Sequence, residues 1–172
     1  MHWLVDGYNV IRQAPELADR ERESLEAGRR ALCRLLSTAA RASGDRFTVV
    51  FDGDREGGST GGGAGVRVVF SSARETADRV LARLATAGAA VVSSDREVRQ
   101  AAARAHAIAI TADRFLARVG RANRVSGLDR ASHGGPDKDD EEPSPPPTKK
   151  GNPRRRSKKD RLAARALGRL GR

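Results

Sequence analysis

Over the first 125 residues, short apolar runs alternate with stretches of helical spacing, and this alternation limits the possible folds more than any other feature. The runs predict five strands: His2–Asp6, Phe47–Phe51, Val66–Phe70, Ala89–Val92 and Ala107–Ile110. The helical stretches are 24–43, Glu75–Ala87, 96–105 and Ala112–Asn123. Strands and helices that alternate in this way favour a mostly parallel sheet with helices on both faces. We therefore expect one α/β domain over residues 1–125.

The glycine-rich segment Gly57–Gly65 lies between the second and third predicted strands. Glycine and serine favour an irregular, flexible loop here. A nucleotide-binding α/β protein would use such a loop to hold phosphates. The segment lacks the lysine that follows the glycines of a P-loop, which counts against that function.

From about Ser126 the periodic pattern is lost. Residues 134–153 are dominated by proline, glycine and charge, and cannot bury enough apolar surface to offset the entropy of ordering. Residues 149–172 carry 11 Lys and Arg against one Asp, a pattern typical of binding to a polyanion such as RNA. Residues 157–170 have helical spacing, but an isolated helix of that length is marginal in water. We expect residues 126–172 to form a disordered linker and basic tail.

Composition excludes several other classes of protein. The only cysteine is Cys33, so a disulfide framework and a cysteine-based zinc cluster are ruled out. No apolar run reaches the roughly 20 residues of a membrane-spanning helix. The N-terminal residues also lack the pattern of a signal peptide. The sequence predicts a soluble, cytoplasmic protein with no membrane partner.

Acidic side chains lie at or just after the ends of most predicted strands. They are Asp6, Asp52, Glu75, Asp78, Asp95 and Asp113. Each alone is ordinary, because Asp favours turns and helix N-caps. The carboxyl ends of parallel strands meet at one edge of a sheet, however, so we expect these acids to crowd together. Crowded carboxylates repel each other, and Mg²⁺ or Mn²⁺ removes that cost and can activate water for attack on a phosphodiester.

Four short motifs, in this order and spacing, resemble the YacP-like branch of the NYN domains, which belong to the PIN-like nucleases. They are DGYNVI at 6–11, VVFDG at 49–53, ETAD at 75–78 and SSD at 93–95. The resemblance covers about residues 1–125. It implies a three-layer PIN-like fold and a metal-dependent endoribonuclease. It also implies mRNA as the substrate and the ribosome as a partner.

The resemblance also implies roles for individual residues. Asp6 and Asp78 match the catalytic acids of the family, and Asp95 matches a later acid. We expect these three to hold Mg²⁺ or Mn²⁺. Asn9 matches the polar residue of the first motif and is expected to contact substrate.

Other side chains near the expected site have supporting roles in this interpretation. Tyr8 is expected to bind substrate as well, because unpaired RNA bases stack on aromatic rings. Asp52, Glu75 and Asp113 are expected to surround the three metal ligands and support them.

Two positions depart from the family pattern. Relatives often carry a further acid one helical turn after Asp78, where this chain has Ala82, and Arg79 occupies a position that is often acidic. These departures support an alternative function, a catalytically inactive RNA-binding module of the same fold. RNA cleavage in Mn²⁺ and in EDTA distinguishes the two.

Overall fold

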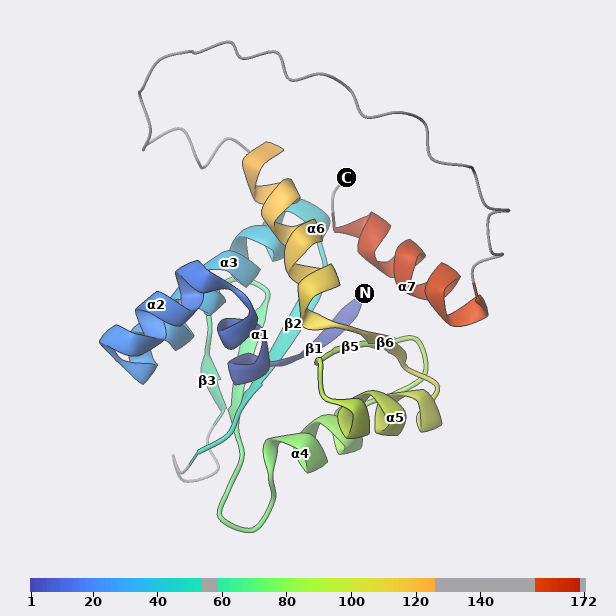
Figure 1. The fold of residues 1–172 in the computed structure, drawn as a ribbon, viewed down its shortest axis with the longest axis horizontal. Coiled ribbons are helices and arrows are strands. Elements are labelled where there is room, and N and C mark those ends of the chain that lie inside the picture. The colour runs from blue at the N-terminus through green and yellow to red at the C-terminus, as the bar shows by residue number, and fades with distance from the viewer. Residues whose placement is uncertain (54–58, 126–156, 171–172) are drawn as a thin grey trace, which may run out of the picture.

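The structure, a computed structural model, describes residues 1–53, 59–125 and 157–170. Within these residues one six-stranded sheet has the order β3-β4-β2-β1-β5-β6 (Figure 1). The strands are β1 His2–Asp6, β2 Arg46–Phe51, β3 Ser59–Gly61, β4 Val66–Phe70, β5 Ala90–Val92 and β6 Ile108–Ile110. β3 pairs antiparallel with β4, and all the other neighbours pair in parallel. The predicted mostly parallel sheet is confirmed.

Helices cover both faces of this sheet (Figure 1). They are α1 Gly7–Gln13, α2 Pro15–Glu23, α3 Leu25–Ser43, α4 Ala77–Leu84, α5 Arg96–Arg104, α6 Ala112–Val125 and α7 Lys158–Arg169. On one face, α1, α2, α3, α6 and α7 pack over a core that includes Trp3, Phe47 and Phe115. On the other, α4 and α5 pack over Leu4 and Val50. The molecule therefore has the three layers that the sequence predicted.

The long helix α3 begins and ends where the sequence predicts. Ser24 caps its N-terminus by accepting a hydrogen bond from the backbone N–H of Ala27 at 3.0 Å. Leu32 and Leu36 are fully buried against the sheet. Gly44 ends the helix with φ of 69°, a left-handed conformation that glycine adopts without steric cost.

The turn from β1 into α1 brings Asp6 to the edge of the sheet. Asp6 caps α1 by accepting from the backbone N–H of Asn9 at 3.3 Å. A Cβ on Gly7 would lie 2.3 Å from a ring carbon of Phe51, so the following residue must be glycine for α1 to pack this closely. Neither α1 nor α2 was predicted from the sequence. α1 has only seven residues, and α2 is densely charged and buries one side chain, Leu17.

The glycine-rich segment contains the strand β3, which the sequence analysis did not predict. β3 pairs through its backbone with Arg67–Val69 of β4. This pairing is made by the backbone and needs no apolar side chains, so no apolar run in the sequence indicates it. The predicted helix Glu75–Ala87 is shorter than expected, because Thr76 caps its N-terminus and Ala85 ends it.

The structure differs from the sequence expectation over 157–170. There α7 packs on the domain, and Ala163, Ala166, Leu167 and Leu170 are buried. Arg118 of α6 donates to the backbone carbonyls of Leu167 and Gly168 at 2.9 and 3.2 Å, which satisfies the C-terminal end of the helix. The tertiary partner stabilises a helix that would be marginal alone. The rest of the predicted linker, residues 126–156, lies outside the described residues.

None of the helices in the described parts of the chain is both long enough and apolar enough to span a membrane.

Candidate active site

An open cleft of about 800 Å³ lies at the carboxyl edge of the sheet, where β1, β2 and β5 end. Four carboxylates line it: Asp6, Asp52, Asp78 and Asp95. β1 and β5 are neighbours in the sheet, and the chain runs from β1 to β2 on one side and from β5 to β6 on the other. Such a switch point is where open α/β sheets bind ligands. The three acids predicted as metal ligands therefore lie in one cleft.

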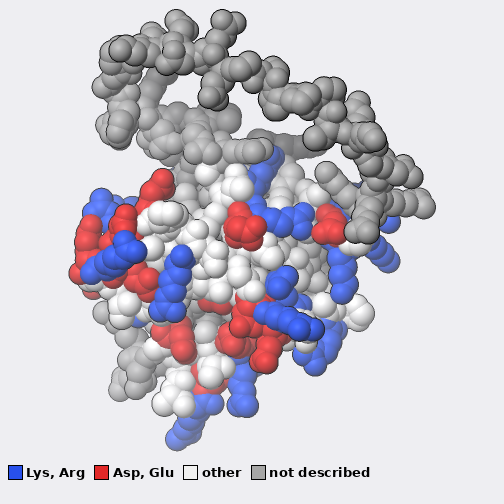
Figure 2. Space-filling model, viewed as in Figure 1, with Lys and Arg blue, Asp and Glu red and all other residues white. Residues whose placement is uncertain are grey.

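Charge is unevenly distributed around this region. Figure 2 shows acidic side chains gathered in the lower centre of the visible face, with Lys and Arg side chains around them. The cleft itself combines its acids with two arginines, Arg12 and Arg29. It can therefore hold a cation on one part of its wall and a phosphate on another.

Asp6 is the least exposed of the three predicted ligands. Burial raises the pKa of its carboxyl, and the neighbouring Asp78 and Asp95 raise this pKa further. Hydrogen bonds from the Ser93 hydroxyl, 2.9 Å from Oδ2, and from the backbone N–H of Asn9 act in the opposite direction. The two hydrogen bonds thus fix the Asp6 carboxyl in position, while burial and the neighbouring acids disfavour its ionised form.

Asp78 lies in the first turn of α4, where Thr76 caps the helix. Its side chain is exposed, yet its pKa is raised, first by partial burial of the carboxyl and then by Asp95 and Asp52. The negative charges of the cleft therefore act on one another.

Asp95 follows β5 and caps α5. Its Oδ1 accepts from the backbone N–H groups of Glu97 and Val98 at 2.6 and 3.3 Å. Its own backbone N–H donates to the Ser93 hydroxyl at 3.1 Å. Because the same hydroxyl donates to Asp6, the fully buried Ser93 links two of the predicted ligands.

Asn9, predicted to contact substrate, lines the cleft but also has a structural contact. Its Oδ1 accepts from the backbone N–H of Ser94 at 2.8 Å, which ties the first motif to the turn after β5. Asp52 also lines the cleft, and its Oδ1 accepts from the Ser71 hydroxyl at 2.6 Å. Asp52 is thus positioned beside the other acids, as the sequence predicted.

The structure does not bring the other two supporting acids to the cleft. Glu75 accepts two hydrogen bonds from Arg83, at 3.0 and 2.9 Å, and lines a separate small pocket. Asp113 lies in the first turn of α6, after the edge strand β6 and away from the central strands that form the cleft. The expectation that these two acids surround the ligands is corrected.

Tyr8 lines the cleft beside two arginines. Arg29 donates to its hydroxyl from Nε at 2.8 Å and also from Nη2. The guanidinium groups of Arg12 and Arg29 lie 5.5 and 5.4 Å from the centre of its ring. Phe51 packs edge-on against it at 5.2 Å. Tyr8, the predicted base-stacking residue, therefore contacts two arginines that are able to bind a phosphate.

Sequence reasoning missed Ser93 and Arg29. Ser93 is the first residue of the SSD motif, but the motif gave no indication that its hydroxyl contacts Asp6. Arg29 did give a signal, because it is a charged residue on the apolar face of α3. It lies at helical spacing from Leu25, Leu32 and Leu36.

The donor set fits a hard divalent cation, because Asp6, Asp78 and Asp95 offer carboxylate oxygens. The raised pKa values of Asp6 and Asp78 indicate a cluster of negative charge that a cation would stabilise. No group of three His, Cys, Asp or Glu among the described residues is yet arranged to hold a metal ion.

Comparisons with known proteins identify the family of the chain. The family model for the YacP-like NYN domain matches residues 3–164. The chain belongs to the YacP-like NYN family. This family is nuclease-like, and its domains typically use divalent metals. The resemblance inferred from the four motifs is confirmed.

Individual relatives share both sequence and fold with the chain. It is 36% identical over 86 residues to the uncharacterized protein YacP of Bacillus subtilis (strain 168), covering 49% of this chain and 51% of YacP. The chain thus spans about half the length of this curated relative. A crystal structure of Rae1 (YacP) from Bacillus subtilis matches with TM-score 0.60 and 28% identity over 73% of this chain and 77% of that one.

A crystal structure of a Rae1 (YacP) variant from the same organism matches with TM-score 0.58 and 26% identity, over 75% of this chain and 86% of that one. The predicted PIN-like fold is confirmed by these matches.

Proposed function

We propose that the protein is an endoribonuclease that depends on a divalent metal and hydrolyses RNA phosphodiester bonds. One observation carries the proposal: Asp6, Asp78 and Asp95 line a single cleft at the switch point of a nuclease-like fold. The raised pKa values of Asp6 and Asp78 support it, because perturbed carboxyls in a cleft are typical of functional sites.

In this proposal Asp6, Asp78 and Asp95 would hold Mg²⁺ or Mn²⁺. When bound, the ion supplies an activated water and stabilises negative charge on the phosphodiester. Ser93 orients Asp6 and the turn that carries Asp95. Arg29, fixed by Tyr8, presents a positive charge to the phosphate.

We extend the proposal to mRNA as the substrate, the ribosome as a partner and the cytoplasm as the location. Membership of the YacP-like family supports the substrate and the partner. The basic residues of 149–172 support contact with RNA in general, because each phosphate contact releases counterions.

The test is cleavage of a labelled RNA in Mn²⁺ or Mg²⁺ and in EDTA. We expect cleavage only with metal, with a 5′-phosphate on the product, and its loss in Asp6→Asn and Asp78→Asn. Asp19→Asn is the matched control, because Asp19 is exposed on α2 and outside the cleft. Near-normal cleavage by both cleft variants would overturn the assignment.

A catalytically inactive RNA-binding module is the second candidate function. Ala82 favours it, because relatives often have an acid there and Ala82 lies one turn after Asp78 on α4. In this case the wild-type protein would bind RNA and leave it uncut with either metal.

A further inference from the structure

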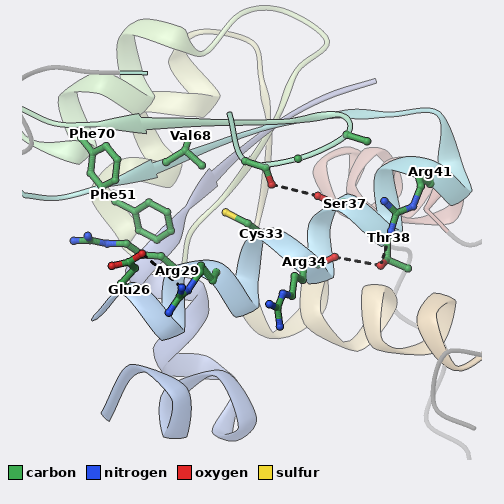
Figure 3. A pocket seen from close by; sticks show the side chains of 14 residues that line it. Glu26, Arg29, Cys33, Arg34, Ser37, Thr38, Arg41, Phe51, Val68 and Phe70 are labelled. Atoms are coloured by element: carbon green, nitrogen blue, oxygen red, sulfur yellow. Dashed lines mark hydrogen bonds and ion pairs between the residues drawn. The ribbon is translucent and has the colours of Figure 1, made fainter. Parts of the chain in front are cut away.

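A second groove, of about 670 Å³, lies between α3 and the sheet (Figure 3). We call it the arginine groove. Its residues come from α3 on one side and from the sheet on the other. Four arginines of α3 line it: Arg29, Arg30, Arg34 and Arg41. Phe51, Val68 and Phe70 line it from the sheet, and Gly62–Ala64 line it from the segment between β3 and β4.

The arginine groove is continuous with the cleft. Arg29 lines both of them. Phe51 lines the groove, and the next residue, Asp52, lines the cleft. A linear polymer bound in the groove can therefore extend directly into the acidic cleft, without crossing another helix or strand.

Three of the arginines form a row. At 3.6 residues per turn, Arg30, Arg34 and Arg41 fall within about 40° of one another around α3 and span roughly 16 Å along it. That is the length of about four or five stacked nucleotides at roughly 3.4 Å each. A row of like charges at this scale matches a ligand with a repeating negative charge.

The charges of this row are largely unneutralised. Arg34 and Arg41 are exposed and form no ion pair within the described residues. Arg30 faces Glu26 at 3.8 Å, and Glu26 is the single carboxylate among the residues that line the groove. The groove therefore carries an excess of positive charge next to an acidic cleft.

Arg29 stands at the junction and has a distinct role. Its guanidinium lies over the rings of Phe51 and Phe70, at 5.6 and 5.1 Å from their centres. Both rings are buried, so the guanidinium covers the aromatic floor. A guanidinium plane fixed in this way is a surface on which an unpaired base can stack.

Glycine keeps the opposite wall close to α3. The Ser37 hydroxyl donates to the Gly62 carbonyl at 3.4 Å. A Cβ on Gly63 would lie 2.6 Å from the Ser37 hydroxyl oxygen, so a side chain there would push the wall away from the helix. The groove has arginines along one wall only, and this single row of positive charge suits one strand rather than the two phosphate rows of a duplex.

We propose that the arginine groove binds a single-stranded segment of RNA next to the bond that the acidic cleft cuts. This inference rests on the proposed nuclease function. Phosphates of the segment lie along Arg30, Arg34 and Arg41, and a base stacks on Arg29 where the strand enters the cleft.

The test is binding of a labelled oligouridylate in EDTA, with Asp6→Asn present in every protein so that no RNA is cut. Arg34→Glu combined with Arg41→Glu reverses two charges of the groove. Arg46→Glu combined with Arg104→Glu reverses two exposed charges on β2 and α5, outside both the groove and the cleft. Equal melting temperatures establish that both double variants are folded.

We expect the groove variant to bind at least tenfold more weakly than its parent. Its slope of log affinity against log salt should fall by about 1.4, because a contact to single-stranded RNA contributes about 0.7. The control variant should change much less. Equal losses in the two variants would overturn the proposal, as would duplex RNA or polyglutamate binding as tightly as the single strand. Since this measurement needs no cleavage, it tests the groove even if the nuclease assay fails.

Discussion

Asp6 lies at the end of β1 under two opposing influences. Burial and the charges of Asp78 and Asp95 raise its pKa, while hydrogen bonds from Ser93 and Asn9 lower it, and the net direction is upward. The folded protein therefore binds this proton more tightly than the unfolded chain does. The free energy of unfolding therefore decreases as the pH rises from the ordinary pKa of an Asp to the raised pKa of Asp6 in the folded protein.

We therefore expect Asp6→Asn to unfold at a higher urea concentration than wild type at neutral pH in EDTA. The difference should shrink at acidic pH, where Asp6 is protonated in both states. Mn²⁺ should raise the melting temperature of wild type and leave Asp6→Asn unchanged, because only the native carboxylates bind the ion. Urea and thermal unfolding with and without Mn²⁺ test this, and an equal Mn²⁺ shift in both proteins would contradict it.

The sequence allowed the shared location of Asp6, Asp78 and Asp95 to be predicted, but not the contacts that hold these acids in place. Asp6 and Asp95 follow apolar strands, and parallel pairing brings such positions together. The same rule failed for Glu75, because Arg83 lies eight residues on and takes both of its carboxylate oxygens. The contact of Ser93 with Asp6 joins residues 87 positions apart, and no local pattern reveals it.

Among the elements, those with a strong local pattern were predictable. β4 has the predicted bounds, and α3 has caps and apolar spacing that are visible in the sequence. The strand β3 and the helix α7 depend on partners elsewhere in the chain. α7 in particular buries Leu167 and Leu170, and the surface that covers them comes from residues far away in the sequence.

We expect Leu170→Ala to lower the free energy of unfolding by about 2–5 kcal/mol, because it empties a fully buried position. Leu162→Ala is the matched control on the same helix, since Leu162 is 41% exposed. It should cost less than about 1 kcal/mol. Urea unfolding of the full chain measures both, and equal small effects would mean that α7 does not pack on the domain in solution.

At the scale of the whole molecule, the proposed catalytic acids and the basic residues of 149–172 lie in different parts of the chain. The acids of the cleft lie within residues 6–95, and the arginine groove lies beside them. Residues 136–148 carry five acidic residues and one Lys, and a further set of basic residues lies between them and α7: Lys149, Lys150, Arg154, Arg155 and Arg156. Since α7 belongs to the domain, truncating the chain near residue 130 would remove packing together with charge.

Replacing these five residues with Gln tests their charge while α7 is kept. We expect weaker RNA binding and a flatter salt dependence, with the slope falling by about 0.7 for each residue that contacts a phosphate. Stability and the cleavage of a dinucleotide should stay unchanged, because the cleft and the buried face of α7 are intact. Binding titrations at several salt concentrations measure the slope. An unchanged affinity and slope would assign this basic segment to something other than RNA, because a phosphate contact cannot lose its charge without losing its counterion release.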